Sequence, residues 1–146
     1  MGWWNVENPY REFMRVNLLI IEADSLFRSN LAKRLPDENW VVLFADQPAE
    51  AMKIIKIKNV DVVLLGLKDL KREGLVLLKR IKKIRPLTEI ITINSPEQID
   101  LSIEGMRLGA FDDFIIPFEL ESIVRRIREA HLKKTGLIQK KKDNRE

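Results

Sequence analysis

The chain has 146 residues, of which 45% are hydrophobic and 33% charged, and this composition predicts one soluble globular domain with a full core and no separate output module. It contains no cysteine, which excludes disulfides, zinc–thiolate sites and iron–sulfur clusters. No apolar run reaches the length of a membrane span and the N-terminus lacks a signal-peptide pattern, so a cytoplasmic protein is expected.

The excess positive charge lies at the C-terminal end of the chain. Residues 131–146 contain six basic and two acidic residues, which accounts for the whole net charge of +4, and the other 130 residues carry twenty of each sign. The predicted folded body is therefore neutral, which weakens the case for a nucleic-acid partner. Residues 135–146 are predicted to form a basic, disordered tail because they are too polar to pack.

An aromatic extension, residues 1–15, precedes the first predicted strand. Trp3, Tyr10 and Phe13 follow the spacing of one helical face, although Pro9 would begin or break a helix there. Two interpretations stay open. The aromatic side chains either anchor a partner protein, since Trp and Tyr dominate binding hot spots, or cover an apolar patch of their own domain.

Between these ends, residues 16–134 are predicted to fold as one domain of alternating strands and helices. The predicted strands cover residues 17–22, 40–44, 62–66, 89–94 and 113–116. The predicted helices cover residues 25–35, 48–58, 74–84, 97–108 and 119–134. The continuous apolar run at 62–65 is typical of a strand that helices cover on both faces. Five βα units joined by short loops predict an α/β fold with a doubly wound parallel sheet.

Helical spacing predicts the buried face of the helix at 97–108. Ile99, Ile103 and Met106 form its expected core stripe. Leu101 and Leu108 lie seven residues apart on another face and are the candidate partner surface.

Ligands of open α/β sheets bind beyond the carboxyl ends of the strands, so the residues found there indicate function. In this chain they are Glu22 with Ala23 and Asp24, Gly66, Asn94 and Ile116. The residue that ends the central strand, Gly66, has no side chain.

Three stretches resemble the receiver domain of two-component response regulators: LLIIEADSLF (18–27), DVVLLGLKDLKREGLVLLKRIK (61–82) and EGMRLGAFDDFIIPF (104–118). The resemblance covers residues 17–130 and includes the Gly-Ala and Pro-Phe signature before the last helix. It implies a CheY-like, flavodoxin-like fold with strand order 2-1-3-4-5 and a role in two-component signal transduction or a phosphorelay.

The chain departs from that family at every reactive position. In the family, an acidic pair after strand one holds Mg²⁺, an Asp ending strand three accepts the phosphoryl group, a Ser or Thr ends strand four, and a Lys precedes the Pro after strand five. The residues at these positions here are Glu22 and Ala23, Gly66, Asn94 and Ile116. The aromatic residue of the family's switch is replaced by Asp113, and Phe114 is expected on the opposite face of the strand.

These replacements predict a degenerate pocket with no phosphorylation site, catalytic residue, metal or cofactor. Gly66 offers no oxygen to attack phosphorus, and Mg²⁺ normally needs one or two carboxylates in near-octahedral oxygen ligation. The favoured interpretation is a pseudo-receiver that is not an enzyme and acts as an adaptor by binding a kinase, a regulator or a second copy of itself. The resemblance places such contacts on the surface formed by the fourth helix, the fifth strand and the fifth helix, where Leu101 and Leu108 are expected.

Two alternatives remain. A nucleic-acid-associated protein would use the basic tail and the basic run at residues 79–85 on the third helix. A divergent receiver would be phosphorylated at an unconventional residue, Asp69, Glu22 or Asp24. His131, the one histidine, is predicted to have a surface role near a helix end.

Overall fold

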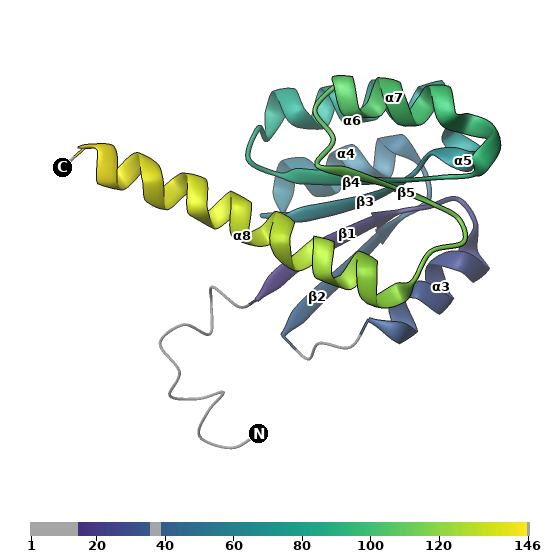
Figure 1. Ribbon diagram of the computed structural model, residues 1–146, viewed down its shortest axis with the longest axis horizontal. Coiled ribbons are helices and arrows are strands. Elements are labelled where there is room, and N and C mark those ends of the chain that lie inside the picture. Colours follow the sequence, from purple (N-terminus) through teal and green to yellow (C-terminus); the bar gives the residue numbers. More distant parts are fainter. Residues whose placement is uncertain (1–14, 36–38, 146) are drawn as a thin grey trace, which may run out of the picture.

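A parallel sheet of five strands forms the centre of the computed structural model, which describes residues 15–35 and 39–145, with side chains described up to residue 136. The strands are β1 (Val16–Ile21), β2 (Trp40–Ala45), β3 (Val62–Gly66), β4 (Glu89–Asn94) and β5 (Asp112–Ile115). Their order in the sheet is β2-β1-β3-β4-β5, and every neighbouring pair is parallel (Figure 1). The predicted flavodoxin-like fold is confirmed.

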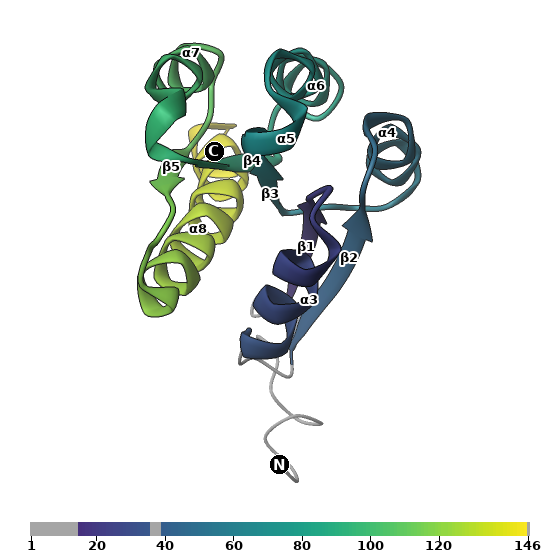
Figure 2. The same ribbon diagram turned by 90° about the vertical axis from the view of Figure 1, so that its right-hand side faces the viewer.

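Helices cover both faces of this sheet. One face is covered by α3 (Ser25–Arg34) and α8 (Leu120–Arg145), and the other by α4 (Pro48–Ile57), α6 (Arg72–Ile84) and α7 (Ile99–Arg107) (Figure 2). Two short turns, α5 (Leu67–Leu70) and the 3₁₀ turn η1 (Pro96–Gln98), follow the carboxyl ends of β3 and β4. No helix in the described ranges combines the length and hydropathy that a membrane crossing requires.

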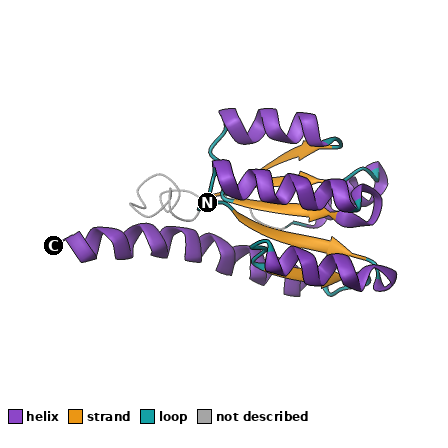
Figure 3. Ribbon diagram, turned by 90° about the horizontal axis from the view of Figure 1, so that it is seen from above, coloured by secondary structure: helices purple, strands orange, loops and turns teal. Residues whose placement is uncertain are grey.

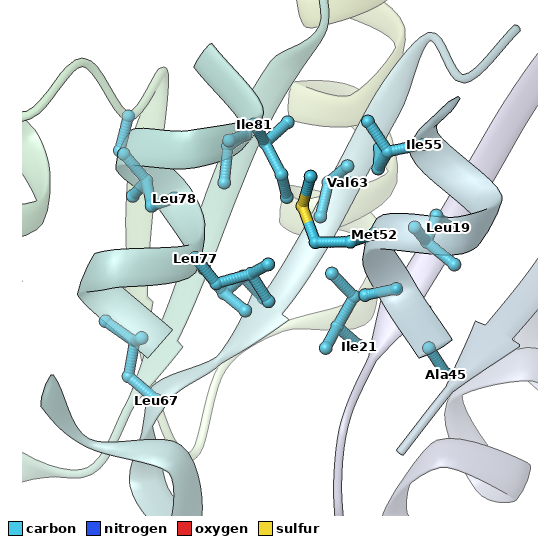
Figure 4. Packing of buried hydrophobic residues seen from close by; sticks show 14 of the residues in the cluster. Leu19, Ile21, Ala45, Met52, Ile55, Val63, Leu67, Leu77, Leu78 and Ile81 are labelled. Atoms are coloured by element: carbon cyan, nitrogen blue, oxygen red, sulfur yellow. The ribbon is translucent and has the colours of Figure 1, made fainter. Parts of the chain in front are cut away.

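The hydrophobic core is divided by the sheet into two clusters. On the α4–α6–α7 face, Leu19 and Val63 of the sheet pack against Met52 of α4 and Leu78 of α6 (Figure 4). On the other face, strand residues pack against Leu31 of α3 and a stripe of α8. Successive side chains of a strand point to opposite faces of the sheet, so the continuous apolar runs supply residues to both clusters. Burying each large aliphatic side chain contributes about 1.5–3 kcal/mol.

The aromatic extension at residues 1–15 falls, except for Arg15, outside the described residues. The C-terminal prediction is wrong, because α8 continues through the expected boundary at Lys134 to Arg145 instead of ending in a disordered tail. Helices commonly end at a glycine that adopts a positive φ. Gly109 has a φ of 108° and follows the end of α7. Gly136 does not have a positive φ, and α8 continues through it. The far half of α8 projects beyond the sheet (Figure 3).

A buried polar cluster fixes α8 against the amino ends of the strands. Lys134 Nζ lies 2.6 Å from Asp61 Oδ1, and Asp61 Oδ2 accepts a 2.8 Å hydrogen bond from the backbone N–H of Asn17. His131 Nε2 is 4.0 Å from the same carboxylate. The predicted surface role of His131 is wrong, because its ring is buried; burial lowers its pKa, Asp61 opposes that shift and Lys134 adds to it.

Candidate functional site

The residues predicted to form the degenerate pocket lie at one edge of the sheet. Glu22 follows β1, Gly66 ends β3, Asn94 ends β4 and Ile116 follows β5. Since β1, β3, β4 and β5 are consecutive parallel neighbours, their carboxyl ends lie side by side. The backbone N–H of Ile116 donates to the Asn94 carbonyl at 2.8 Å, which extends the β4–β5 pairing to this edge.

Glu22 occupies the space that a side chain at position 66 would need. A Cβ atom added to Gly66 would lie 2.8 Å from Cδ of Glu22 and closer still to its Oε2. The backbone of Gly66 has φ −79°, which any residue can adopt. A side chain at position 66 would therefore have to displace the Glu22 carboxylate, whereas the backbone conformation at this position does not call for glycine.

The Glu22 carboxylate is buried and held in place. Its Oε1 accepts a 3.1 Å hydrogen bond from the backbone N–H of Asp24, and its backbone carbonyl accepts one from Arg28 Nη1 at 2.7 Å. Burial raises the pKa of Glu22, and the negative charges of Asp69 and Asp24 raise it further, whereas the bond from Asp24 N–H and the charge of Lys68 oppose the shift. Desolvation therefore favours the protonated form of this carboxyl.

This pocket does not fit a magnesium ion. Glu22 supplies its single buried carboxylate, and the side chains at positions 23 and 66, Ala23 and Gly66, carry no oxygen. Within the residues whose side chains are described, no group of three or more His, Asp or Glu side chains is arranged to hold a metal ion. Asp69 is in α5 and acts on Glu22 as a repelling charge rather than as a shared ligand.

A second polar group links β4 to β5 behind the pocket. The Asp113 carboxylate accepts hydrogen bonds from Asn94 Nδ2, at 2.6 Å, and from the hydroxyl of Thr92. Asn94 is fully buried, and its Oδ1 has no hydrogen-bond partner among the described residues. Phe114 packs with Phe118 in the cluster on the α3–α8 face, so the prediction that it points away from the Asp113 side is confirmed.

Thr92 was missed by the sequence reasoning. It lies two residues before Asn94 on β4, so both side chains are on the same face of the strand, and its partner in the register of β5 is Asp113. The two-residue spacing between Thr92 and Asn94 was the sequence signal that could have identified Thr92 as a neighbour of Asn94.

Ile116 places an apolar side chain at the carboxyl end of the fifth strand. It packs among the partly buried residues of the α3–α8 face and lines a hollow with Phe27 and Pro117. An aliphatic side chain at this position can neither donate a hydrogen bond to an anion nor neutralise one.

The predicted partner surface on α7 is wrong. Leu101 is 5% exposed and Leu108 packs against the core, whereas Ile99, Ile103 and Met106 are 62%, 52% and 45% exposed. Both sets have helical spacing, so periodicity alone could not decide between them. Small residues decide it: Gly105 lies beside Leu101 on the buried face, where an added Cβ would already contact Thr92 at 3.7 Å.

The comparisons with known proteins agree with this architecture. A model of the response regulator receiver domain matches residues 18–128. The chain is 29% identical over 118 residues to an NtrX-like response regulator of Rickettsia felis, an alignment that covers 80% of this chain and 25% of that protein. It is 30% identical over 113 residues to the transcriptional regulatory protein DltR of Streptococcus agalactiae, covering 77% and 50% of the two chains.

Solved structures give the same result. The receiver domain of NtrX from Brucella abortus matches with a TM-score of 0.72 and 25% identity, covering 78% of this chain and 97% of that one. A response regulator receiver domain protein from Clostridium thermocellum matches with a TM-score of 0.74 and 27% identity, covering 84% and 98%. This chain spans a quarter to a half of the length of the two curated relatives, and it belongs to the response regulator receiver domain family of two-component systems.

Proposed function

We propose that this protein is a pseudo-receiver that acts without phosphorylation, as a signalling adaptor that binds another protein. The observation that carries the proposal is the pairing of Glu22 with Gly66. The position from which a receiver domain would present its acceptor carboxylate holds a glycine, and the carboxylate of Glu22 fills the space beside it. Asp24 and Asp69, the other candidate acceptors, share the neighbourhood of Glu22 without forming a metal site.

The hydrogen bonds of Asp113 support the same proposal. A phosphorylation switch needs groups at the ends of β4 and β5 that exchange partners between two states. Here the Asn94 amide and the Thr92 hydroxyl are both bound to one carboxylate. This arrangement favours a single conformation, as an adaptor that presents a constant surface requires.

The exposed stripe on α7 supplies that surface. Ile99, Ile103 and Met106 lie at i, i+4 and i+7, so they form a continuous apolar strip along one side of the helix. Apolar residues grouped on a surface in this way mark protein-binding sites more often than isolated ones do. We infer that a kinase, a regulator or a second copy of the chain packs against this strip.

The contacts of the basic run at residues 79–85 weaken the alternative that the protein binds nucleic acid. Lys82 lies 3.7 Å from Glu89 and donates hydrogen bonds to the carbonyls of Pro86 and Thr88. Arg85 donates to the carbonyls of Ile55 and Lys56. Two of the five basic residues therefore hold the fold together rather than forming a free surface.

Ile103→Glu tests the adaptor surface. It places a charge in the middle of the strip, so we expect self-association, measured by sedimentation, and capture of an identified kinase or regulator to fall at least tenfold. Ile57→Glu, on α4, is the matched control because Ile57 is 77% exposed and lies on a different helix. Both variants are expected to unfold at the same urea concentration as the parent. Equal binding by the two variants would contradict the assignment of the surface.

A further inference from the structure

Figure 2 shows α3 and α8 on the same face of the sheet. Side chains of both helices line two hollows, which form a groove between them. The two hollows, of about 280 and 480 Å³, adjoin there, because Arg34 and Leu120 line both of them. Phe27 and Phe118 stand at one end of the groove, and Arg128 at the other.

The floor of the groove is apolar and its rim is basic. Leu31 and Val124 are buried and belong to the core cluster of this face. The basic residues that line the groove are Arg34, Arg125 and Arg128. Glu121 is the one acidic residue in the lining, so the groove carries a net charge of +2 from three arginines and one glutamate. A segment with aromatic side chains and acidic groups would be complementary to it.

The chain contains such a segment before β1. Residues 1–14 include two of the three tryptophans and the one tyrosine of the protein. The aromatic residues of the segment are Trp3, Trp4, Tyr10 and Phe13. Its charged side chains are Glu7, Arg11 and Glu12, which give a net charge of −1, opposite in sign to the groove.

This segment joins the folded body next to the groove. It leads into β1, whose first residue, Val16, pairs with Trp40 of β2. The guanidinium of Arg128 lies over the Trp40 ring, 5.7 Å from its centroid. The amino end of β1 is therefore at the Arg128 end of the groove.

The segment is also long enough. From Arg128 back to Leu120, the groove follows eight residues of α8, or about 12 Å of helix. Residues 3–14 would span about 18 Å as a helix and up to about 40 Å when extended. The segment can therefore cover the groove in either conformation.

We propose that residues 1–14 dock in the α3–α8 groove of their own chain. The tryptophans pack against its apolar floor, and the two glutamates face the arginines of its rim. Docking buries aromatic surface and covers the α3–α8 face, which leaves the opposite face of the sheet, with α7, open to other proteins. The inference stands independently of the adaptor proposal, because it concerns the other side of the molecule.

A nitroxide attached to Gly2→Cys tests the docking directly, since the chain has no other cysteine. In the full ¹⁵N-labelled chain, we expect the amide signals of Phe27, Leu120 and Val124 to lose most of their intensity, and those of α4 and α7 to keep theirs. Undiminished signals along the groove would overturn the proposal. A mixture of ¹⁵N-labelled chain without nitroxide and unlabelled chain with it should show no loss. A loss along the groove in this mixture as well would mean that the groove takes the segment of a second copy, contrary to the proposal.

Charge exchange tests the recognition without changing the core. Glu7→Lys/Glu12→Lys should restore most of the lost intensity, because the segment then repels the rim. Adding Arg125→Glu/Arg128→Glu should bring the signal loss back, whereas adding Lys53→Glu/Lys56→Glu, the same change at exposed sites on α4, should not. Failure of the groove pair to restore docking, or equal restoration by both pairs, would overturn the charge pairing.

Discussion

At the scale of single residues, Glu22 and Gly66 complement each other in volume. The carboxylate of Glu22 lies where a Cβ at position 66 would have to go, although the backbone at Gly66 has an ordinary φ. A substitution at position 66 must therefore displace a buried, hydrogen-bonded carboxylate. The stability of each variant then depends on the residue at the other position.

A double-mutant cycle measures this dependence. Gly66→Ala alone should lower the free energy of unfolding by about 1–3 kcal/mol, the usual cost of overpacking. In a Glu22→Ala background the carboxylate no longer occupies this space, so the same change should raise the free energy of unfolding by about 0.4–1 kcal/mol by restricting the unfolded chain. Urea unfolding gives all four values. Additive effects would show that the two residues do not compete for space.

The protonation of Glu22 should appear in the pH dependence of stability. Burial raises the pKa of Glu22 in the folded state above its ordinary value of 4.5, so the folded protein binds this proton more tightly than the unfolded chain does. The resulting stability is fully present below pH 4.5 and is lost as pH rises through the raised pKa. Glu22→Gln removes this titration. The difference in unfolding free energy, variant minus parent, should therefore become more positive as pH increases from 4 to 7. A difference between the two proteins that stays constant with pH would contradict a raised pKa.

The strand-end residues were predictable from the sequence, but their contacts were not. Each apolar run has a clear end, so Gly66, Asn94 and Ile116 could be placed from spacing alone. The direction of the long Glu22 side chain has no signature in a hydrophobic pattern. It depends on the packing that surrounds it, and the occupied space beside Gly66 became visible only in three dimensions.

At the scale of elements, α8 is positioned by charge as well as by its apolar stripe. Ile123 and Ile127 are fully buried, and about two turns beyond Ile127 Lys134 reaches the Asp61 carboxylate at the amino end of β3. Both charged side chains are about 10% exposed, so neither can be compensated by water if its partner is removed. This anchor lies next to the residues that begin the projecting part of the helix.

Removing one member of that pair should be costly. Lys134→Met leaves Asp61 buried without its cation, and we expect the free energy of unfolding to fall by about 3–5 kcal/mol. Adding Asp61→Asn should recover part of the loss, because the amide carries no charge and its oxygen can still accept the hydrogen bond from Asn17 N–H. Arg107→Met, which breaks an exposed 3.8 Å pair with Glu104, serves as the control and should cost less than about 1 kcal/mol. Equal losses for Lys134→Met and Arg107→Met would rule out the anchoring role.

The elements show where sequence patterns suffice and where they fail. The strand at 89–94 has the predicted bounds, and β1 and β5 each begin one residue early, because apolar runs define strands well. The pattern failed for α7, which carries two apolar stripes, and the flanking small residue Gly105 was the better guide to the buried one. It failed again at Gly136, because a glycine signals a helix end without determining its φ.

At the scale of the whole molecule, the two faces of the sheet have different surfaces. The α3–α8 face carries a basic groove beside the start of β1, and the opposite face carries the exposed apolar strip of α7. Between them, the carboxyl edge of the sheet carries Glu22, Ala23, Gly66, Asn94 and Ile116 at the strand ends. We propose that this chain binds its partners without phosphorylation at that edge.

The central claim is tested most directly by the intact mass of the full chain after incubation with Mg²⁺ and acetyl phosphate, beside a receiver domain that retains its acceptor Asp as the positive control. We expect no phosphoryl adduct on this chain under conditions in which the control is modified, because Gly66 offers no nucleophile and Glu22 is buried without a metal site. An adduct that maps to Asp69, Asp24 or Glu22 would contradict the account and would identify the protein as a working receiver with a displaced acceptor.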